Sequence, residues 1–192
     1  VVDDIRAVLG RVSAAIYGNP SYDVPVIGIT GTSGKTTTSY LIESAFRTAG
    51  HSVGMIGTTG SRINGVRVPS SLTTPEAPDL QRLFATMRDD GVHRIVMEVS
   101  SHSLLLGRVG GTRFRIGAFL NLSQDHLDFH HTMEEYFQAK ARLFTKDSGT
   151  CCDRAVICID DSWGLRMRDI AEASGCTPVT VSTTGNADYS AG

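Results

Sequence analysis

The 192-residue sequence lacks several features that would mark a membrane, secreted or nucleic-acid-binding protein. No apolar run reaches the roughly 18 residues of a membrane-spanning helix, and no basic segment followed by an apolar stretch marks a signal peptide. Its 18 basic residues are scattered among 20 acidic ones, without the basic cluster that nucleic-acid binding requires. We therefore expect a cytoplasmic protein that binds neither membrane nor nucleic acid.

Cysteine is also scarce, with four residues that all lie in the last quarter of the chain. None forms the Cys-x-x-Cys pair of a zinc site, and their spacing does not suggest a disulfide framework. We expect reduced thiols.

What the sequence does have is a glycine-rich loop between an apolar stretch, Val24–Ile29, and a helical pattern that begins near Lys35. A strand that enters such a loop and leaves it as a helix directs backbone N–H groups at one point, which suits a polyphosphate. A standard P-loop has glycine at position 29, where this chain has isoleucine, so the loop is a shortened Gly-x-x-Gly-Lys-Thr. Lys35 would reach the outer phosphates, and the Thr36 hydroxyl would bind magnesium.

The rest of the chain alternates strand and helix patterns. Further strands are expected over 53–57, 94–99, 116–120, 155–159 and 179–181. Repeated strand–helix units predict an α/β fold with a doubly wound, mostly parallel sheet whose ligands bind at the carboxyl ends of the strands. Asn64-Gly65 between short β-favouring runs predicts a β-hairpin inserted near 61–69. A helix is expected to begin at Thr74-Pro75-Glu76, with proline in its first position.

Glu98 ends an otherwise apolar strand, at the edge where the phosphate loop also opens. A carboxylate there can bind magnesium or its water shell, although it could instead cap the next helix. The apolar character of the strand favours the metal.

Three histidines and two acids lie within Asp125–His131, after another buried strand. His126 and His130 are four residues apart and could bind zinc from one helical face, but no Glu follows His126 as in the zinc-protease motif. Histidines that only cap turns are the other interpretation.

Lys140 falls on the apolar face of a helix that begins with a capping box at Thr132–Glu135. Tyr136, Phe137 and Phe144 are spaced three or four residues from it. Burial would lower its pKa and favour a neutral amine, which can add carbon dioxide and become an anionic metal ligand. On spacing alone, a lysine whose stem only passes its apolar neighbours is the favoured interpretation.

Five segments in this order resemble the motifs of the Mur ligases, and most of all the MurE branch, which adds the third residue of the peptidoglycan stem peptide. They are Gly31–Thr37, Thr73–Glu76, Met97–His102, Asn121–Asp128 and Tyr136–Phe144. The resemblance implies an ATP-dependent amide ligase, which phosphorylates the terminal carboxylate of its substrate and lets an amine displace the phosphate.

The resemblance also implies roles for individual residues. ATP would be bound by Gly31, Thr32, Ser33, Gly34, Lys35, Thr36, Thr37 and Asn121. Two Mg²⁺ ions would be bound by Thr36, Glu98, His126 and a carbamate on Lys140. The catalytic residues would be Lys35, Glu98, His126 and Lys140. Thr73, Thr74, Ser100 and Arg108 would contact a UDP-N-acetylmuramoyl dipeptide.

In the resembling enzymes the central ATPase domain lies between two others. We therefore expect residues 1–24 to be the tail of a preceding substrate-binding domain with a linker, and residues 25–192 a truncated central domain. Such a fragment would be monomeric and inactive alone, and the added diamino acid, meso-diaminopimelate or L-lysine, is not readable from it. Two alternatives stay open: a ligase related to folylpolyglutamate or cyanophycin synthetases, and a non-catalytic P-loop nucleotide-binding module.

Overall fold

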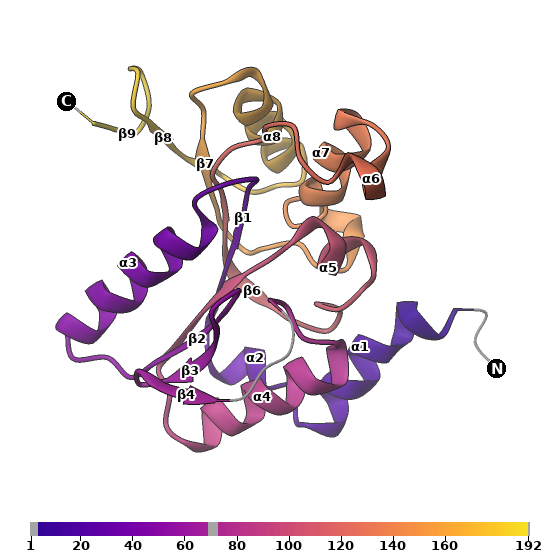
Figure 1. Ribbon diagram of the computed structural model, residues 1–192, viewed down its shortest axis with the longest axis vertical. Helices are drawn as coiled ribbons and strands as arrows, with labels where there is room; N and C mark the ends of the chain where they lie inside the picture. Colours follow the sequence, from indigo (N-terminus) through magenta and orange to yellow (C-terminus); the bar gives the residue numbers. More distant parts are fainter. Residues whose placement is uncertain (1–3, 69–72, 192) are drawn as a thin grey trace.

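The computed structural model describes residues 4–68 and 73–191. Within them, nine strands form one sheet in the order β4-β3-β2-β5-β1-β6-β7-β8-β9 (Figure 1). The strands are β1 (Val26–Thr30), β2 (Val53–Gly57), β3 (Gly60–Ile63), β4 (Val66–Val68), β5 (Arg94–Glu98), β6 (Phe114–Phe119), β7 (Ala155–Cys158), β8 (Val179–Ser182) and β9 (Tyr189–Ser190). The helices are α1 (Ile5–Ile16), α2 (Pro20–Asp23), α3 (Lys35–Thr48), α4 (Ala77–Asp89), α5 (Ser101–Leu105), α6 (Leu127–His130), α7 (Met133–Ala141) and α8 (Ser162–Ala173), with a 3₁₀ turn, η1, at Lys146–Ser148.

The sheet is mostly parallel. From β2 through β5, β1, β6, β7 and β8 to β9, each neighbouring pair runs parallel, and only the β2–β3 and β3–β4 pairs are antiparallel. This confirms the predicted α/β fold. The carboxyl ends of β1, β2, β5 and β6 therefore meet at one edge, where the segments that follow them can form a common site.

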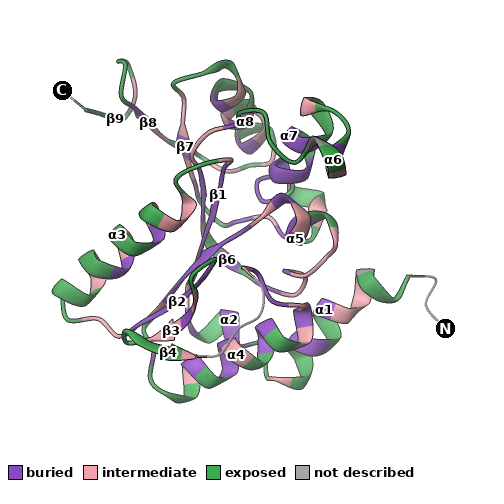
Figure 2. Ribbon diagram, viewed as in Figure 1, coloured by how far each residue is buried: buried purple, intermediate pink, exposed green. Residues whose placement is uncertain are grey.

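Alternate residues of each strand point to opposite faces of the sheet, and each face has its own apolar cluster. One face packs under α3 with Ile27, Ile29 and Val96 at its centre. The other is covered by α4, α5, α7 and α8, and buries residues such as Phe84 and Phe137. Figure 2 shows the buried strands enclosed between helices whose outer sides are exposed. The two helical layers make the sheet doubly wound.

The predicted hairpin is present as β3 and β4. Asn64 and Gly65 have φ angles of 51° and 84°, the left-handed pair that a tight two-residue turn needs. The hairpin is not a separate ribbon, because β3 pairs with β2 and extends the sheet. Pro69, at the end of the expected segment, lies outside the described residues.

The predicted start of α4 was wrong by a few residues. Glu76 has extended backbone, with ψ 152°, and is the N-cap, so that Ala77 begins the helix and Pro78, not Pro75, lies in its first turn. Thr74 is held outside the helix because its hydroxyl donates a hydrogen bond to the Glu98 carbonyl oxygen at 3.0 Å. A tertiary contact thus decides where the helix begins.

The segment before β1 lies against the same body. Helices α1 and α2 pack on α4, and a Cβ at Gly10 would collide with the backbone of Gly110. Assignment of residues 1–24 to a preceding domain stays a prediction, and residues 1–3 lie outside the described part. No helix in the described ranges is long and apolar enough to span a bilayer.

Candidate active site

The phosphate-binding loop joins the carboxyl end of β1 to the start of α3. Gly34 is the N-cap of α3 with φ 86°, a left-handed conformation that favours glycine. The first N–H groups of α3 have no carbonyl one turn earlier to accept from them, so they are available to an anion. The Lys35 ammonium donates to the carbonyl oxygens of Gly31 and Thr32, each at 2.8 Å. Lys35 is thus folded back over the loop that it follows.

Asn121, which follows β6, holds this loop from the neighbouring strand. Its Oδ1 accepts from the Ser33 N–H at 2.9 Å, and its Nδ2 donates to the Ser33 carbonyl at 3.2 Å. Its own carbonyl accepts from the Thr32 N–H at 3.1 Å. Three hydrogen bonds from one residue fix the backbone of the loop before any ligand arrives.

Glu98 ends β5 and is 1% exposed. Its Oε1 accepts from the Thr36 hydroxyl and from the Thr58 N–H, each at 3.0 Å, and its Oε2 accepts from the Thr58 hydroxyl at 3.1 Å. A Cβ at Gly57 would collide with Glu98 Oε1. The carboxylate therefore occupies space that only a glycine at the end of β2 leaves open.

Lys140 lies in α7, on the apolar face where its spacing placed it, and is 1% exposed. Its ammonium donates to the Gly31 carbonyl oxygen at 2.9 Å, the same oxygen that accepts from Lys35. It also lies 4.5 Å from the centre of the Tyr136 ring. Burial, and then the nearby Lys35 charge, lower the pKa of Lys140 to about 7. A neutral amine is therefore well populated near neutral pH.

The histidines gather beside Tyr136, but His126 is not enclosed. His126 has φ 53°, precedes α6 instead of lying in it, and its side chain is 46% exposed. Its ring lies 5.0 Å from that of His102 and 6.0 Å from that of Tyr136. His126 and His130 therefore do not share a helical face, and the sequence-based geometry for a zinc pair was wrong.

His130, in contrast, is buried. Its Nε2 lies 2.8 Å from the Ser101 hydroxyl oxygen. Burial and the neighbouring His102 and Lys140 lower the pKa of His130 to about 4, so its ring is neutral at physiological pH. This histidine acts as a polar link between α5 and α6.

Comparison with known proteins places this arrangement in a family. Residues 29–192 match the family model of the Mur ligase middle domain. The chain belongs to the Mur ligase family. It is 62% identical, over its whole length, to the UDP-N-acetylmuramoyl-L-alanyl-D-glutamate–2,6-diaminopimelate ligase of Corynebacterium glutamicum. It is 52% identical, over 98% of its length, to the ligase of the same name from Streptomyces avermitilis. The chain spans 36% of the length of each of these relatives.

Solved structures agree with the assignment of this chain to the Mur ligase family. A UDP-N-acetylmuramoyl-L-alanyl-D-glutamate–2,6-diaminopimelate ligase is similar with a TM-score of 0.83 and 34% identity, over 99% of this chain and 39% of that one. E. coli FolC in complex with ADP has a TM-score of 0.69 and 20% identity, over 94% of this chain and 48% of that one. At that identity FolC shows the shared fold alone.

The four residues expected to contact the peptide substrate lie on two connecting segments, Thr73 and Thr74 between β4 and α4, and Ser100 and Arg108 between β5 and β6. The Thr73 hydroxyl donates to that of Thr58 at 3.4 Å, and Thr74 is held to β5 as described. Ser100 is the N-cap of α5 and accepts from the Ser103 N–H at 3.1 Å. Arg108 Nε lies 2.7 Å from Glu76 Oε1, in an ion pair without hydrogen-bond alignment. Thr73, Thr74 and Ser100 thus make hydrogen bonds with neighbouring residues, and Arg108 makes an ion pair.

Sequence reasoning missed two residues of the site, Thr58 and Tyr136. Thr58 directly follows β2, and ligands of such sheets bind at the carboxyl ends of the strands, so this position in the sequence could have identified it. Tyr136 was assigned only to the core, but its hydroxyl lies 3.3 Å from that of Thr32, and its ring lies under Lys140. It joins α7 to the phosphate loop.

The donor set suits magnesium better than zinc. Thr36 and Glu98 supply hydroxyl and carboxylate oxygens next to the loop, and Mg²⁺ binds through few such ligands together with water and phosphate. Among the residues that the structure describes, no three His, Cys, Asp or Glu side chains form a metal-binding group. The residues therefore fit an ion whose ligands include phosphate oxygens, and not an ion bound by protein side chains alone.

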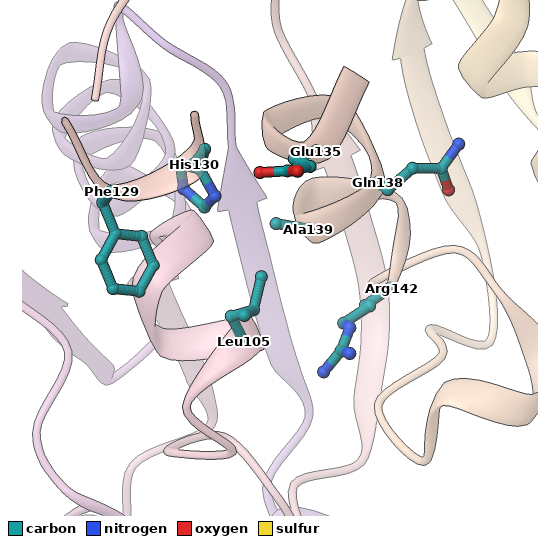
Figure 3. Close-up of a pocket in the computed structure, with 7 residues that line it drawn as sticks. All are labelled: Leu105, Phe129, His130, Glu135, Gln138, Ala139 and Arg142. Carbon is teal, nitrogen blue, oxygen red and sulfur yellow. The ribbon is translucent and has the colours of Figure 1, made fainter. Parts of the chain in front are cut away.

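A cavity of about 290 Å³ lies between α5, α6 and α7 (Figure 3). Its lining residues are Leu105, Phe129, His130, Glu135, Gln138, Ala139 and Arg142. None of these belongs to the phosphate loop, so this cavity is separate from the loop's anion-binding end.

Proposed function

We propose that these residues form the ATP-binding core of a ligase that joins diaminopimelate to UDP-N-acetylmuramoyl-L-alanyl-D-glutamate in peptidoglycan synthesis. One observation carries the proposal: Lys35 and the buried Lys140 converge on the Gly31 carbonyl oxygen, beside the Thr36–Glu98 pair. A module that only bound nucleotide would not need a second, buried lysine there. The printed names of the relatives support the substrates.

In this proposal the loop from Gly31 to Thr37 binds the phosphates of ATP. The N–H groups at the start of α3 donate to them, and Lys35 exchanges its two loop carbonyls for the outer phosphates. Asn121 keeps the loop in shape while Lys35 moves. Because the loop is already held, ATP binding loses little free energy to ordering.

Thr36 and Glu98 would hold one Mg²⁺ ion, and His126 with a carbamate on Lys140 would hold a second. The ions supply positive charge that neutralises phosphate and carboxylate as they approach. Formation of the carbamate requires a neutral amine, which the lowered pKa of Lys140 supports.

The ligase chemistry then proceeds in two displacements. The terminal carboxylate of the muramoyl dipeptide, held by Thr73, Thr74, Ser100 and Arg108, attacks the γ-phosphorus, and ADP leaves. The amine of diaminopimelate attacks the resulting acyl phosphate, loses a proton, and phosphate leaves as the amide forms. Lys35 stabilises the transferring phosphoryl group throughout, so catalysis consists of positioning and electrostatics.

The proposal is tested by phosphate release from a ligase chain of the relatives' full length that contains these 192 residues. With ATP, Mg²⁺ and UDP-N-acetylmuramoyl dipeptide, we expect more release with meso-diaminopimelate than with L-lysine. Release that needs a folate or another acid as acceptor would contradict it.

We propose a cytoplasmic, monomeric enzyme, and size-exclusion chromatography with light scattering tests the monomer.

Replacement of Asn121 tests the preformed loop. Asn121→Ala removes the two side-chain hydrogen bonds to Ser33. If these bonds contribute about 1–2 kcal/mol to the free energy of the binding-ready loop, their loss weakens nucleotide binding roughly tenfold. Titration calorimetry of this chain with Mg²⁺-ATP measures the effect. The exposed Asn186→Ala is the matched control. Equal affinities for the two variants would show that Asn121 does not organise the loop.

A further inference from the structure

Two partly exposed thiols lie together at the amino edge of the sheet, opposite the phosphate loop. Cys151 precedes β7, and Cys176 lies between α8 and β8. Both thiols donate to one acceptor, the Cys152 carbonyl oxygen, at 3.5 Å from Cys151 Sγ and 3.4 Å from Cys176 Sγ. The fold therefore pairs two thiols that are well separated in the sequence.

The other two cysteines differ from this pair. Cys152 is 3% exposed, and its side chain packs against Gly117, where an added Cβ would approach its Sγ to 2.8 Å. Cys158 ends β7, at the opposite end of that strand from Cys151. All four thiols are free. Cys151 and Cys176 thus combine proximity to each other with access to solvent.

We propose that Cys151 and Cys176 are a modification site that forms a reversible disulfide on exposure to a peroxide. The Cys176 thiolate attacks a peroxide oxygen; an S–O bond forms, the O–O bond breaks, and the departing oxygen takes a proton and leaves as water. Cys151 then gives its proton to solvent and attacks the sulfenic sulfur as a thiolate; the S–S bond forms, the S–O bond breaks, and the departing hydroxide takes a proton and leaves as a second water. In total, two thiols lose two electrons and two protons, and one hydrogen peroxide becomes two waters.

The surroundings of the pair support this order of reaction. Burial and the neighbouring Cys176 raise the pKa of Cys151 to about 11, so Cys151 remains a thiol at neutral pH and Cys176 is the sulfur that meets the peroxide first. Only a small fraction of Cys151 is thiolate, so the second, resolving step is the slower one. Burial also raises the pKa of Cys152 far above its usual range, which keeps that third sulfur unreactive. The chemistry is therefore confined to one pair.

The bond would connect the start of β7 to the start of β8 and enclose α8 between them. A crosslink of this kind restricts the unfolded chain and so stabilises the folded one. Because it lies at the amino edge, it leaves the phosphate loop unchanged. We expect oxidation to raise the midpoint of thermal unfolding without changing the affinity for nucleotide.

The experiment treats the reduced chain with hydrogen peroxide, blocks remaining thiols by alkylation, and analyses intact protein and tryptic peptides by mass spectrometry. We expect two of the four thiols to disappear, the mass to fall by two hydrogens, and dithiothreitol to reverse both changes. The crosslink should be absent in Cys151→Ser and Cys176→Ser, and present in Cys158→Ser. A crosslink that persists in Cys151→Ser, or stepwise oxidation without any crosslink, would overturn the proposal.

A second measurement needs no oxidation. Dibromobimane becomes fluorescent after alkylating two neighbouring thiols, so the reduced protein should gain fluorescence that Cys151→Ser abolishes and Cys158→Ser keeps. Circular dichroism establishes that each variant is folded. Equal fluorescence in folded Cys151→Ser and Cys158→Ser would show that the pair is not formed in solution.

Discussion

Lys140→Met is expected to reduce ligase turnover by about 10²–10³-fold and to make the folded chain more stable at neutral pH. The loss of turnover follows because methionine cannot form a carbamate or place charge beside Lys35 at the Gly31 carbonyl. Turnover is measured in a full-length ligase chain, with added short carboxylic acids to replace the missing anion. Partial rescue by these acids is expected for Lys140→Ala, which leaves space for them, and not for Lys140→Met.

The gain in stability follows from the cost of burying the ammonium. The folded-state pKa of Lys140 is about 7, against 10.5 for a free lysine. Between these values the unfolded chain binds the proton more tightly, so stability rises with pH across this window. The penalty is complete below pH 7 and disappears above about pH 10.5. The Gly31 carbonyl still accepts from Lys35, so methionine leaves no unpaired oxygen there.

Thermal unfolding in carbon-dioxide-free buffer measures this second effect. We expect Lys140→Met to unfold at a higher temperature than the unmodified chain at pH 6, by on the order of 2–4 °C for each kcal/mol relieved, with the difference shrinking toward pH 10. Lys146→Met, at an exposed lysine of the same chain, is the matched control and should show no such trend. A methionine variant that is less stable at every pH would contradict a buried, neutralised amine.

Gly57→Ala is expected to weaken magnesium-dependent nucleotide binding strongly. The added methyl group would collide with Glu98 Oε1, so the carboxylate must leave the position in which it accepts from Thr36 and Thr58. Loss of one charged ligand and of its hydrogen bonds corresponds to roughly 10²-fold weaker binding. Calorimetric titration of this chain with ATP, with and without Mg²⁺, measures the change.

Gly54→Ala, on the same strand, separates this effect from damage to the fold. A Cβ there meets the flexible Met87 side chain, at 2.5 Å from its sulfur, on the face away from the loop. We expect it to lower stability and leave the affinity of the folded protein unchanged. In a Glu98→Ala background, Gly57→Ala should have little further effect on affinity, because the collision partner is gone. An additive loss in the double variant would show that Gly57 acts by another route.

The local pattern of the chain predicted much of the fold. Short apolar runs identified the strands, Asn64-Gly65 identified the hairpin, and Gly34-Lys35-Thr36 identified the loop that opens α3. These predictions succeeded because turn chemistry and side-chain period depend on neighbours in the sequence. Spacing along α7 also placed Lys140 on the apolar face of that helix, since residues three and four apart share a helix face.

Other features depend on which strands are neighbours in the sheet, and local pattern does not contain that order. The placement of β1 between β5 and β6 brings Glu98 and Asn121 to the phosphate loop, and the pairing of β2 with β5 brings Thr58 to Glu98. The later start of α4 likewise follows from contacts between distant segments. So does the meeting of Cys151 with Cys176.

The amino-acid sequence alone therefore determined that this chain has an anion-binding loop, a doubly wound sheet and a lysine on an apolar helix face. Periodicity and turn residues specify those features without reference to the rest of the molecule. Only the tertiary structure decided that Lys35 and Lys140 share one carbonyl oxygen and that Glu98 occupies the space left by Gly57. Such convergence requires strand ends and helices from separate segments to pack within hydrogen-bonding distance.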